Sequence, residues 1–531
     1  MAPAALTITG ALVVDGSGEE PRHATVQVHE GRITAVEPPA AAAATTTGGE
    51  VVEAGGLVLA PGFIDMHAHS DLALVSGAHA EAKLAEGVTT QVIGQDGLGY
   101  APMDDASAAQ LRRQIAGWNG DHPLDWRSMA DFLDVLDAGA PTHAAVLTPH
   151  GNLRLLAMGN DRRAPQDSEL DRMTGLLRES LAAGSAGLSM GLTYAPGMYA
   201  RTEELTALCE VVAEAGGYIS PHTRSYGAGA LEAFAEMIEL GRRTGVRMHL
   251  THATMNFPLN AGRGADLLRL VDEARADGVE VSMDTYPYLA GATTLSALLP
   301  GWVSEGGPDA TLHRIAEPRT RRRILTELDE TGSDGAHGVP VDWSAIEISG
   351  TGQESLRDRV GRRVSELARH EGRPPAEVAL DLMSADDLAT TILMHVGHEE
   401  NVRAIMRHPW HCGGSDGILV GEKPHPRARG TFGRYLGRYV RELGVLSLAE
   451  AVRHLSATPA RVVGLDDRGT IRPGAVADLV LLDPEAIRDT ATYDDPRGLT
   501  HGVRRVWLEG RPAWHDGAVL DARAGHALRL R

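Results

Sequence analysis

The chain has 531 residues, a net charge of −21, and apolar and charged fractions of 43% and 23%. These fractions are those of an ordinary globular protein, and the length predicts more than one domain. The negative charge argues against a nucleic acid or an anionic membrane as partner. Cysteine occurs only as Cys209 and Cys412, which excludes a disulfide framework and a zinc site of several thiolates.

Membrane association and secretion are not expected. No apolar run approaches the roughly 20 residues that are needed to span a bilayer. The first residues lack the basic region and the long apolar core of a signal peptide. We therefore expect a cytoplasmic protein whose partner is a small molecule.

Both ends of the chain alternate apolar and polar residues as β-strands do. Between residues 5 and 37, short runs of this kind are separated by Asp15-Gly16 and Glu30-Gly31, which indicates hairpins. The stretch 38–49 is rich in Ala, Thr and Gly, and is typical of a flexible surface loop. The β pattern returns at 477–482 and 503–510. We therefore predict a small β-sandwich domain assembled from residues 1–60 and 461–531.

The middle of the chain, residues 61–460, alternates short apolar runs with longer helical stretches such as 231–244. Repeated βα units imply a parallel sheet, and about eight of them imply a closed barrel. We therefore expect the α/β class and a (β/α)8 TIM-like barrel. The expected strands are 88–93, 144–147, 186–192, 218–220, 248–251, 281–286 and 392–394, together with the segments that end at His67 and Asp416.

That count is one strand more than a barrel of eight needs. One segment is therefore expected to lie outside the barrel, and 392–394 is the candidate. Residues from about 290 to 350 have no clear βα rhythm and carry many Gly, Pro and Arg residues. This composition favours an inserted subdomain or lid.

Four histidines and one aspartate stand at the ends of expected strands. His67 and His69 lie two residues apart, and side chains at i and i+2 of a strand point to the same side, so both rings can reach one ion. His222 and His252 each close a later run, and Asp416 ends the last barrel unit. Because the C-terminal strand ends of a barrel converge on one face, we expect a metal site there. Imidazole and carboxylate suit zinc, with iron or manganese as alternatives.

Further motifs are spread along the chain. In order, they are Ala85-Glu-Gly-Val-Thr-Thr, Gly187-Leu-Ser-Met-Gly-Leu-Thr-Tyr-Ala-Pro-Gly, Asp284-Thr-Tyr-Pro-Tyr, His408-Pro-Trp, Gly414-Ser-Asp-Gly, Pro424-His-Pro-Arg-Ala-Arg-Gly-Thr-Phe and Gly469-Thr-Ile-Arg-Pro-Gly. Together they resemble the D-aminoacylase (N-acyl-D-amino-acid deacylase) family of the amidohydrolase superfamily. The resemblance implies zinc-dependent hydrolysis of the amide bond in an N-acyl-D-amino acid or a related N-acyl amine.

The resemblance also implies one or two zinc ions per chain. His67, His69 and Asp416 would form one metal position, and His222 with His252 the other. A metal-bound water has a pKa near 7 instead of about 15.7, which supplies hydroxide at neutral pH. Asp416 would accept a proton from that water and pass it to the leaving nitrogen.

The family supplies a further ligand, a cysteine after the second barrel strand, and here this sequence has Asp96. A carboxylate can ligate or bridge two ions, so Asp96 is expected to be a ligand, with capping of the following turn as the alternative. Other branches of the superfamily bridge their metals with a carbamylated lysine. Neither Lys83 nor Lys423 lies at a suitable strand end.

Residues toward the substrate are implied in the same way. Tyr194 would help to stabilise the oxyanion, with a packed strand residue as the alternative. Arg224 and Arg427 are candidates to hold an anionic group, because arginine binds carboxylates bidentately. For Arg224, a solvated surface ion pair is the alternative.

Two positions depart from the family pattern. Where the family has a lysine and a serine that bind the α-carboxylate of the substrate, this sequence has Thr254 and Ala292. The family's tyrosine is present as Tyr286. The loss of a cation and a hydroxyl suggests a leaving group other than a simple D-amino acid. A cyclic amide or lactone hydrolase of the same superfamily and a non-catalytic homologue are the alternative readings.

Overall fold

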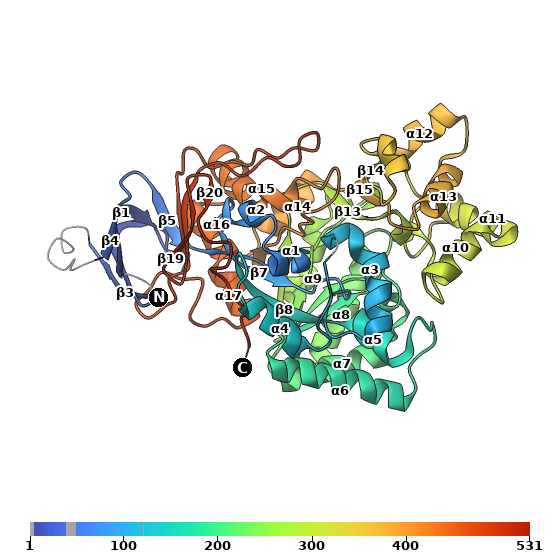
Figure 1. The fold of residues 1–531 in the computed structure, drawn as a ribbon, viewed down its shortest axis with the longest axis horizontal. Coiled ribbons are helices and arrows are strands. Elements are labelled where there is room, and N and C mark those ends of the chain that lie inside the picture. The colour runs from blue at the N-terminus through green and yellow to red at the C-terminus, as the bar shows by residue number, and fades with distance from the viewer. Residues whose placement is uncertain (1–4, 39–48, 121, 531) are drawn as a thin grey trace.

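The computed structural model describes residues 5–38, 49–120 and 122–530. Along its long axis, a sheet made from both chain ends is followed by a central barrel and then by a smaller subdomain (Figure 1). Apart from its two end residues, the predicted loop 38–49 lies outside the described residues. In the part of the chain that is described, no helix is long and apolar enough to cross a bilayer.

The terminal sheet has nine strands and includes both ends of the chain. Its β2 and β3 form one of the predicted hairpins, and the φ angles of Glu30 and Gly31, 50° and 77°, are the left-handed values of a tight two-residue turn. Strand β5 pairs antiparallel with β17, which joins the two ends as predicted. The strands are β1 (Ala5–Val13), β2 (Arg22–His29), β3 (Arg32–Glu37), β4 (Gly49–Glu53), β5 (Val58–Pro61), β17 (Leu479–Leu482), β18 (Val503–Leu508), β19 (Arg511–His515) and β20 (Ala518–Val519).

The central barrel has eight parallel strands in the order β16-β12-β11-β10-β9-β8-β7-β6. The amide of Met66 donates to the carbonyl of Gly413 at 3.2 Å, and Ala68 bridges Gly417, which brings the first and last strands together. The predicted (β/α)8 barrel is confirmed. Its strands are β6 (Phe63–Asp65), β7 (Val88–Ile93), β8 (His143–Pro149), β9 (Gly187–Gly191), β10 (Tyr218–His222), β11 (Arg247–Leu250), β12 (Val281–Thr285) and β16 (His411–Gly413).

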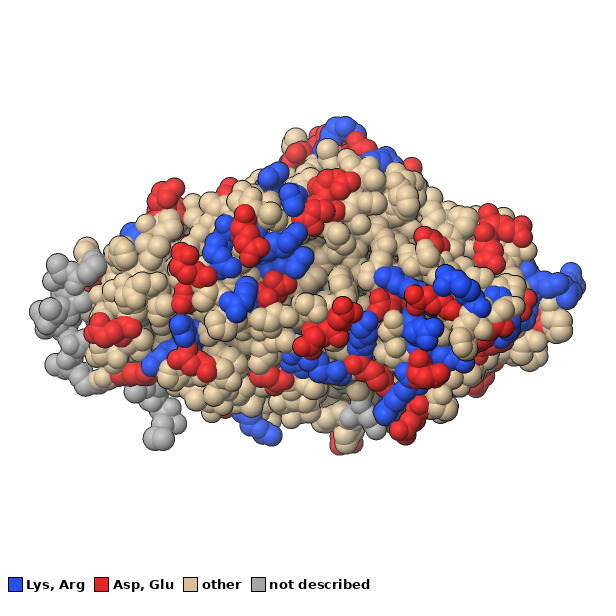
Figure 2. Space-filling model, turned by 90° about the horizontal axis from the view of Figure 1, so that it is seen from above, with Lys and Arg blue, Asp and Glu red and all other residues tan. Residues whose placement is uncertain are grey.

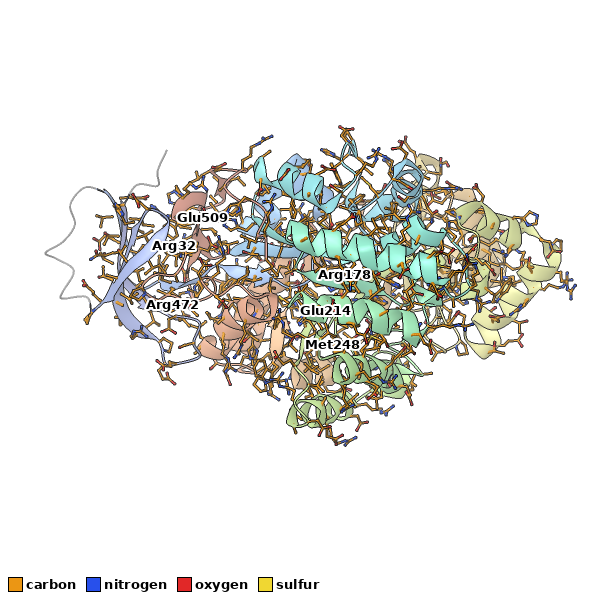
Figure 3. All side chains as sticks on the ribbon, turned by 90° about the horizontal axis from the view of Figure 1, so that it is seen from below. Arg32, Arg178, Glu214, Met248, Arg472 and Glu509 are labelled. Atoms are coloured by element: carbon orange, nitrogen blue, oxygen red, sulfur yellow. The ribbon has the colours of Figure 1, made fainter. Side chains whose placement is uncertain are left out.

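Amphipathic helices cover the outside of the barrel. The helix expected at 231–244 is α8, which buries Phe234, Met237 and Ile238 at helical spacing against the strands. On the solvent side, Arg178 and Glu214 join two neighbouring helices at 3.2 Å (Figure 3). The helices of the barrel layer are α1 (Asp71–Ser76), α2 (Ala80–Leu84), α3 (Asp105–Asn119), α4 (Met129–Asp137), α5 (His150–Met158), α6 (Asp167–Ala183), α7 (Thr202–Glu214), α8 (Ala230–Thr244), α9 (Gly264–Ala276), α14 (Glu399–Met406), α15 (Arg427–Arg434), α16 (Leu448–Leu455) and α17 (Ala457–Val463).

A subdomain is inserted between β12 and β16. Its antiparallel sheet has the order β13-β15-β14, so the segment 392–394 lies outside the barrel, as expected. The elements continue to His395, beyond residue 350 where the sequence placed their end, because β15 returns to pair with both other strands. The elements are β13 (Ala290–Thr294), α10 (Pro308–Ala316), α11 (Pro318–Thr326), β14 (Ile346–Gly350), α12 (Val364–Glu371), α13 (Pro375–Ala385) and β15 (Thr391–His395).

Charged side chains of both signs are interspersed on the face seen in Figure 2. Elsewhere in the described part of the chain, charged side chains form ion pairs across neighbouring elements, such as Arg321 with Asp381 at 2.7 Å in the inserted subdomain. The net charge of −21 is therefore not gathered into one acidic patch on this face.

Candidate metal centre and active site

The six predicted metal ligands lie at the C-terminal ends of the barrel strands. His222 is the last residue of β10, and the other ligands stand two to four residues beyond β6, β7, β11 and β16. His67 and His69 therefore follow β6, whereas we had expected them to form the end of the strand itself. Their spacing still works, because the bridge between Ala68 and Gly417 keeps this backbone extended beside its neighbour.

His67, His69, Asp96 and Asp416 form one group of ligand atoms. The Nε2 atoms of His67 and His69 are 3.3 Å apart, and the Nε2 of His69 lies 3.2 Å from Oδ1 of Asp416. The two carboxylate oxygens of Asp96 lie 3.5 Å from these imidazole nitrogens, one from each ring. One ion at the centre of the group could contact all four side chains, because the ligand atoms lie within 4.8 Å of one another.

Asp96, His222 and His252 form a second group. The Nδ1 of His222 is 3.1 Å from the Nε2 of His252, and these atoms lie 3.5 and 3.6 Å from the Asp96 carboxylate. Asp96 therefore belongs to both groups, with one oxygen or the other directed at each of four imidazoles. A carboxylate in this position could serve either group or bridge the two, and the role of Asp96 as a metal ligand stays a prediction.

Three of the ligands have a left-handed backbone. The φ angles are 55° at Asp96, 31° at His252 and 47° at Asp416. Few residues other than glycine adopt this region, although Asp and His do so more often than most, and such conformations cluster at functional sites. The backbone at these strand ends is therefore shaped to direct ligands at the centre of the barrel face.

Two residues that the sequence reasoning missed hold the histidines in place. The carboxylate of Asp284, in β12, accepts hydrogen bonds from the backbone N–H of His252 at 2.8 Å and from the Nε2 of His249 at 3.0 Å. The hydroxyl of Thr193 lies 2.7 Å from the Nε2 of His222, which leaves the Nδ1 of that ring for the ligand group. Partners of this kind fix the orientation and tautomer of metal-binding histidines. Asp284 stands in a motif that marked the resemblance, which could have identified it.

A buried ion pair between Asp65 and Lys83 lies next to the first group of ligands. Asp65 accepts from the Nζ of Lys83 at 2.9 Å and from the backbone N–H groups of Ser415 and His67, at 2.8 and 3.3 Å. It thereby ties the loop after β6 to the loop after β16. Lys83 is held in this buried ion pair with Asp65.

Burial and charge shift the pKa values of two neighbouring rings in opposite directions. Burial lowers the pKa of His67 to about 4, against the attraction of the nearby carboxylates. Burial also disfavours a charge on His69, but Asp416 and Asp96 outweigh it and raise the pKa of that ring to about 10. Asp416 also lies 2.8 Å from the Nη2 of Arg427, which helps to hold the pKa of this buried carboxyl well below its usual range.

The donor set fits divalent zinc. Imidazole nitrogen and carboxylate oxygen are the ligands of catalytic zinc sites. The Nδ1 of His67 and the Oδ1 of Asp96 are buried and have no hydrogen-bond partner within the described residues. Buried polar atoms are normally paired, so an unpaired carboxylate oxygen between two histidine groups is consistent with a cation at this position.

A cavity of about 610 Å³ opens over the second ligand group. Tyr194, Tyr286, Thr254 and Ala292 all line it, so the structure brings these predicted substrate residues together. The inserted subdomain contributes a further residue, His337, that no pattern in the sequence indicated.

Arg427 is fully buried behind this cavity. Its guanidinium lies over the ring of Tyr286, 4.3 Å from the centroid, with Nη2 next to Asp416. Its Nε and Nη1 have no hydrogen-bond partner in the described part of the chain. Arg427 therefore orients Asp416, and its charge is already partly balanced by that carboxylate.

Arg224 does not line the cavity. Its Nε donates to Glu236 of α8 at 2.8 Å, and its Nη2 donates to the carbonyl of Ala200 at 2.7 Å. The guanidinium thus forms an ion pair, the alternative that the sequence left open, and a role of Arg224 in substrate binding stays a prediction. The sequence alone does not show that Arg224 pairs with Glu236 on the following helix.

The fold and the ligand groups together define the chain as a metal-dependent hydrolase of the TIM-barrel type. A model of the amidohydrolase family matches residues 50–513. The chain therefore belongs to the amidohydrolase family, and the resemblance seen in its motifs is confirmed.

Relatives match over the whole length. An N-acyl-D-glutamate deacylase of Alcaligenes xylosoxydans xylosoxydans is 34% identical, with 99% of this chain and 96% of that protein covered. A D-aminoacylase of the same organism is 32% identical, with 99% and 98% covered. A solved structure of the N-acyl-D-glutamate deacylase of Bordetella bronchiseptica, in complex with zinc and a phosphonate inhibitor, has a TM-score of 0.84 at 31% identity and covers 99% of this chain and 100% of its own.

Proposed function

We propose that this enzyme is a zinc-dependent deacylase that hydrolyses the amide bond of N-acyl-D-amino acids or related N-acyl amines. The proposal depends on one observation: two pairs of histidines share the carboxylate of Asp96. They do so on the C-terminal face of the barrel, where TIM-barrel enzymes have their active sites. The deacylase relatives act on N-acyl-D-glutamate and related compounds, and this supports the choice of substrate.

The six ligand side chains would hold zinc as one or two ions, and zinc supplies a water of lowered pKa and polarises a carbonyl. Asp416 is placed to accept the proton of the attacking water, since its Oδ1 faces the ligand group while Oδ2 is held by Arg427. The same carboxyl would return the proton to the leaving nitrogen.

Tyr194 would donate to the oxygen of the scissile carbonyl. Its ring centroid lies 4.8 Å from that of His222, and its hydroxyl lies 3.1 Å from the Oγ1 of Thr293 in the cavity wall. Burial raises the pKa of Tyr194 well above its usual value, so the phenol keeps its proton and remains a donor.

The leaving amine would face Thr254, Ala292 and Tyr286. None of these three side chains carries a positive charge, and the nearby Arg427 is paired with Asp416. We therefore propose that the free α-carboxylate of a simple D-amino acid is bound weakly, and that neutral or amidated analogues are accepted.

Two measurements on the purified protein test the proposal. The first is its metal content, and the second is its activity on N-acyl-D-amino acids, their L-enantiomers, N-acyl amines and cyclic amides. We expect bound zinc and release of free amine from the D-configured or achiral acyl compounds. Protein that contains and takes up no transition metal would refute the proposal. Hydrolysis confined to cyclic amides would replace it with the alternative reading.

A further inference from the structure

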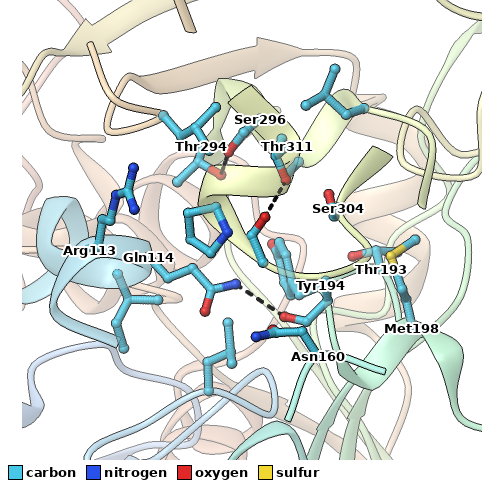
Figure 4. Close-up of a pocket in the computed structure, with 18 of the residues that line it drawn as sticks. Arg113, Gln114, Asn160, Thr193, Tyr194, Met198, Thr294, Ser296, Ser304 and Thr311 are labelled. Atoms are coloured by element: carbon cyan, nitrogen blue, oxygen red, sulfur yellow. Dashed lines mark hydrogen bonds between the residues drawn. The ribbon is translucent and has the colours of Figure 1, made fainter. Parts of the chain in front are cut away.

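A second cavity, of about 770 Å³, adjoins the active-site cavity. Both cavities are lined by Thr193, Tyr194 and Ala297, so these residues form their common wall. Most of the other lining residues come from α3, from the loop after β9 and from the inserted subdomain, and Asn160 from the loop after α5 joins them (Figure 4).

The lining of this second cavity mixes apolar and neutral polar side chains, and its charged residues, Arg113 and Asp387, are paired with each other. Gln114 donates to the carbonyl of Ala195 at 3.2 Å, and the hydroxyl of Thr311 donates to the carbonyl of Gly307 at 3.0 Å (Figure 4). Trp118 stands next to the active site, since its ring lies 5.0 Å from that of His69 and 5.7 Å from that of Tyr194.

The indole N–H of Trp118 is buried and has no hydrogen-bond partner within the described residues. An indole N–H usually finds a partner when it is buried. In the wall of a cavity, a ligand acceptor or a water can provide one.

The charges that border the second cavity are already paired. The guanidinium of Arg113 donates from Nε to Asp387 and from Nη1 to Asp309, both at 2.7 Å. An anionic ligand would compete with two carboxylates for this guanidinium. The cavity is therefore suited to an uncharged group.

We propose that the second cavity is the subsite for the acyl group, and that the natural acyl group is uncharged and larger than acetyl. This inference rests on the proposed deacylase function and names its acyl side. The amide of the substrate is planar and trans, so its two substituents point away from each other. With the carbonyl at Tyr194 and the leaving amine toward Thr254 and Ala292, the acyl chain is directed past Tyr194 into the second cavity.

A series of N-acyl derivatives of one amine tests this subsite on the whole zinc-loaded enzyme. We compare kcat/KM for N-acetyl, N-butanoyl, N-hexanoyl and N-succinyl compounds. Each buried methylene contributes roughly a fourfold preference, so N-hexanoyl should exceed N-acetyl by at least about tenfold even with incomplete burial. N-succinyl should fall below N-butanoyl, because its carboxylate meets no free cation in the described lining.

Filling the cavity provides the matched variant. Ser304 is partly buried in the cavity wall. Ser304→Trp should fill the space, so that kcat/KM for the N-hexanoyl compound lies within about threefold of that for the N-acetyl compound. Ser168→Trp on the exposed surface of α6 is the control and should keep the parental ratio. If Ser304→Trp does not fold, Met198→Phe adds bulk from the loop after β9 and serves the same purpose.

The outcomes separate the two hypotheses. Hydrolysis of N-acetyl compounds without any gain from longer chains overturns the subsite and leaves the deacylase function standing. A gain that persists unchanged in both filled variants also overturns it, because the chain is then bound elsewhere. Absence of hydrolysis throughout the series, in protein shown to contain zinc, removes the proposed function and the subsite with it.

Discussion

The barrel face and the inserted subdomain form opposite walls of one cavity and differ sharply in chemistry. The barrel face places four histidines and two aspartates within contact distance, fixed by buried partners such as Asp284 and Asp65. The opposite wall has mainly neutral groups, among them Ala292 and Met394. We therefore expect the strand ends to supply the reacting groups and the inserted subdomain to contribute to substrate selectivity.

The largest expected effect is on the barrel face. Replacing Asp96 by Ala removes an oxygen from both ligand groups at once. Loss of a residue that only hydrogen-bonds to a metal ligand lowers metal affinity by about tenfold to hundredfold. Loss of the ligand Asp96 itself should lower it by more. Titration with zinc, measured by competition with a chelator, gives the affinity. Asp105→Ala, at an exposed carboxylate of α3, is the control.

The same position sharpens the comparison with the family. A carboxylate is a harder ligand than a thiolate, so manganese or cobalt should replace zinc readily in the parent enzyme and less readily in Asp96→Cys. If Asp96→Ala binds zinc and turns over like the parent, Asp96 is only a turn residue.

The second prediction concerns proton transfer. Asp416→Asn keeps the shape of the side chain but removes the acceptor, so kcat should fall by about 10² or more while the fold persists. Circular dichroism and metal content are measured beside turnover, because Asp416 also belongs to a ligand group. An Asn variant with bound metal and nearly parental kcat would show that another group is the base.

Much of this arrangement could be predicted from the sequence, because each ligand follows an apolar run that becomes a barrel strand. The C-terminal strand ends of a barrel converge on one face regardless of loop conformation. Local sequence patterns were therefore enough to predict that His67 and His252 lie on the same face. His337 could not be predicted, since its place depends on how the inserted chain folds back. Its carbonyl accepts the N–H of Ala228 at 3.0 Å, a contact between segments far apart in sequence.

The partners of some polar side chains were also beyond prediction. Thr193 stands within one of the motifs, but only the packing of the loops after β9 and β10 sets the partners of Thr193 and Arg224. The hydroxyl of Thr193 faces His222, whereas the guanidinium of Arg224 turns to Glu236. Residue type alone suggested a substrate contact for Arg224 and none for Thr193.

The third prediction breaks the neutrality of the amine-facing side of the cavity. Thr254→Lys introduces a cation where the leaving amine is expected, and a charge-assisted hydrogen bond to a carboxylate contributes roughly 1.5 to 3 kcal/mol. Preference for a free N-acyl-D-amino acid over its amidated analogue should therefore rise by about tenfold to a hundredfold.

Thr254→Met is the matched control, with similar length and no charge. The measurement is the ratio of kcat/KM for the acid and the amide. A parent that already strongly prefers the acid would mean that other residues bind the carboxylate, and our interpretation of Thr254 would then be wrong.

The smallest effect is expected at Thr193, which acts on the metal only through His222. Thr193→Val removes the 2.7 Å contact with Nε2 and leaves that nitrogen without its partner. The ring can then turn and offer either nitrogen, so zinc affinity should fall by about tenfold, at the lower end of the range for such partners. Thr193→Ser restores the hydroxyl and should bind zinc like the parent. Zinc affinity of the metal-free protein is the readout, because Thr193 also lines both cavities and its loss could alter turnover through the substrate. If Val and Ser variants bind zinc equally well, the hydroxyl does not position His222, and the ring is held by packing against Tyr194 and Tyr226 alone.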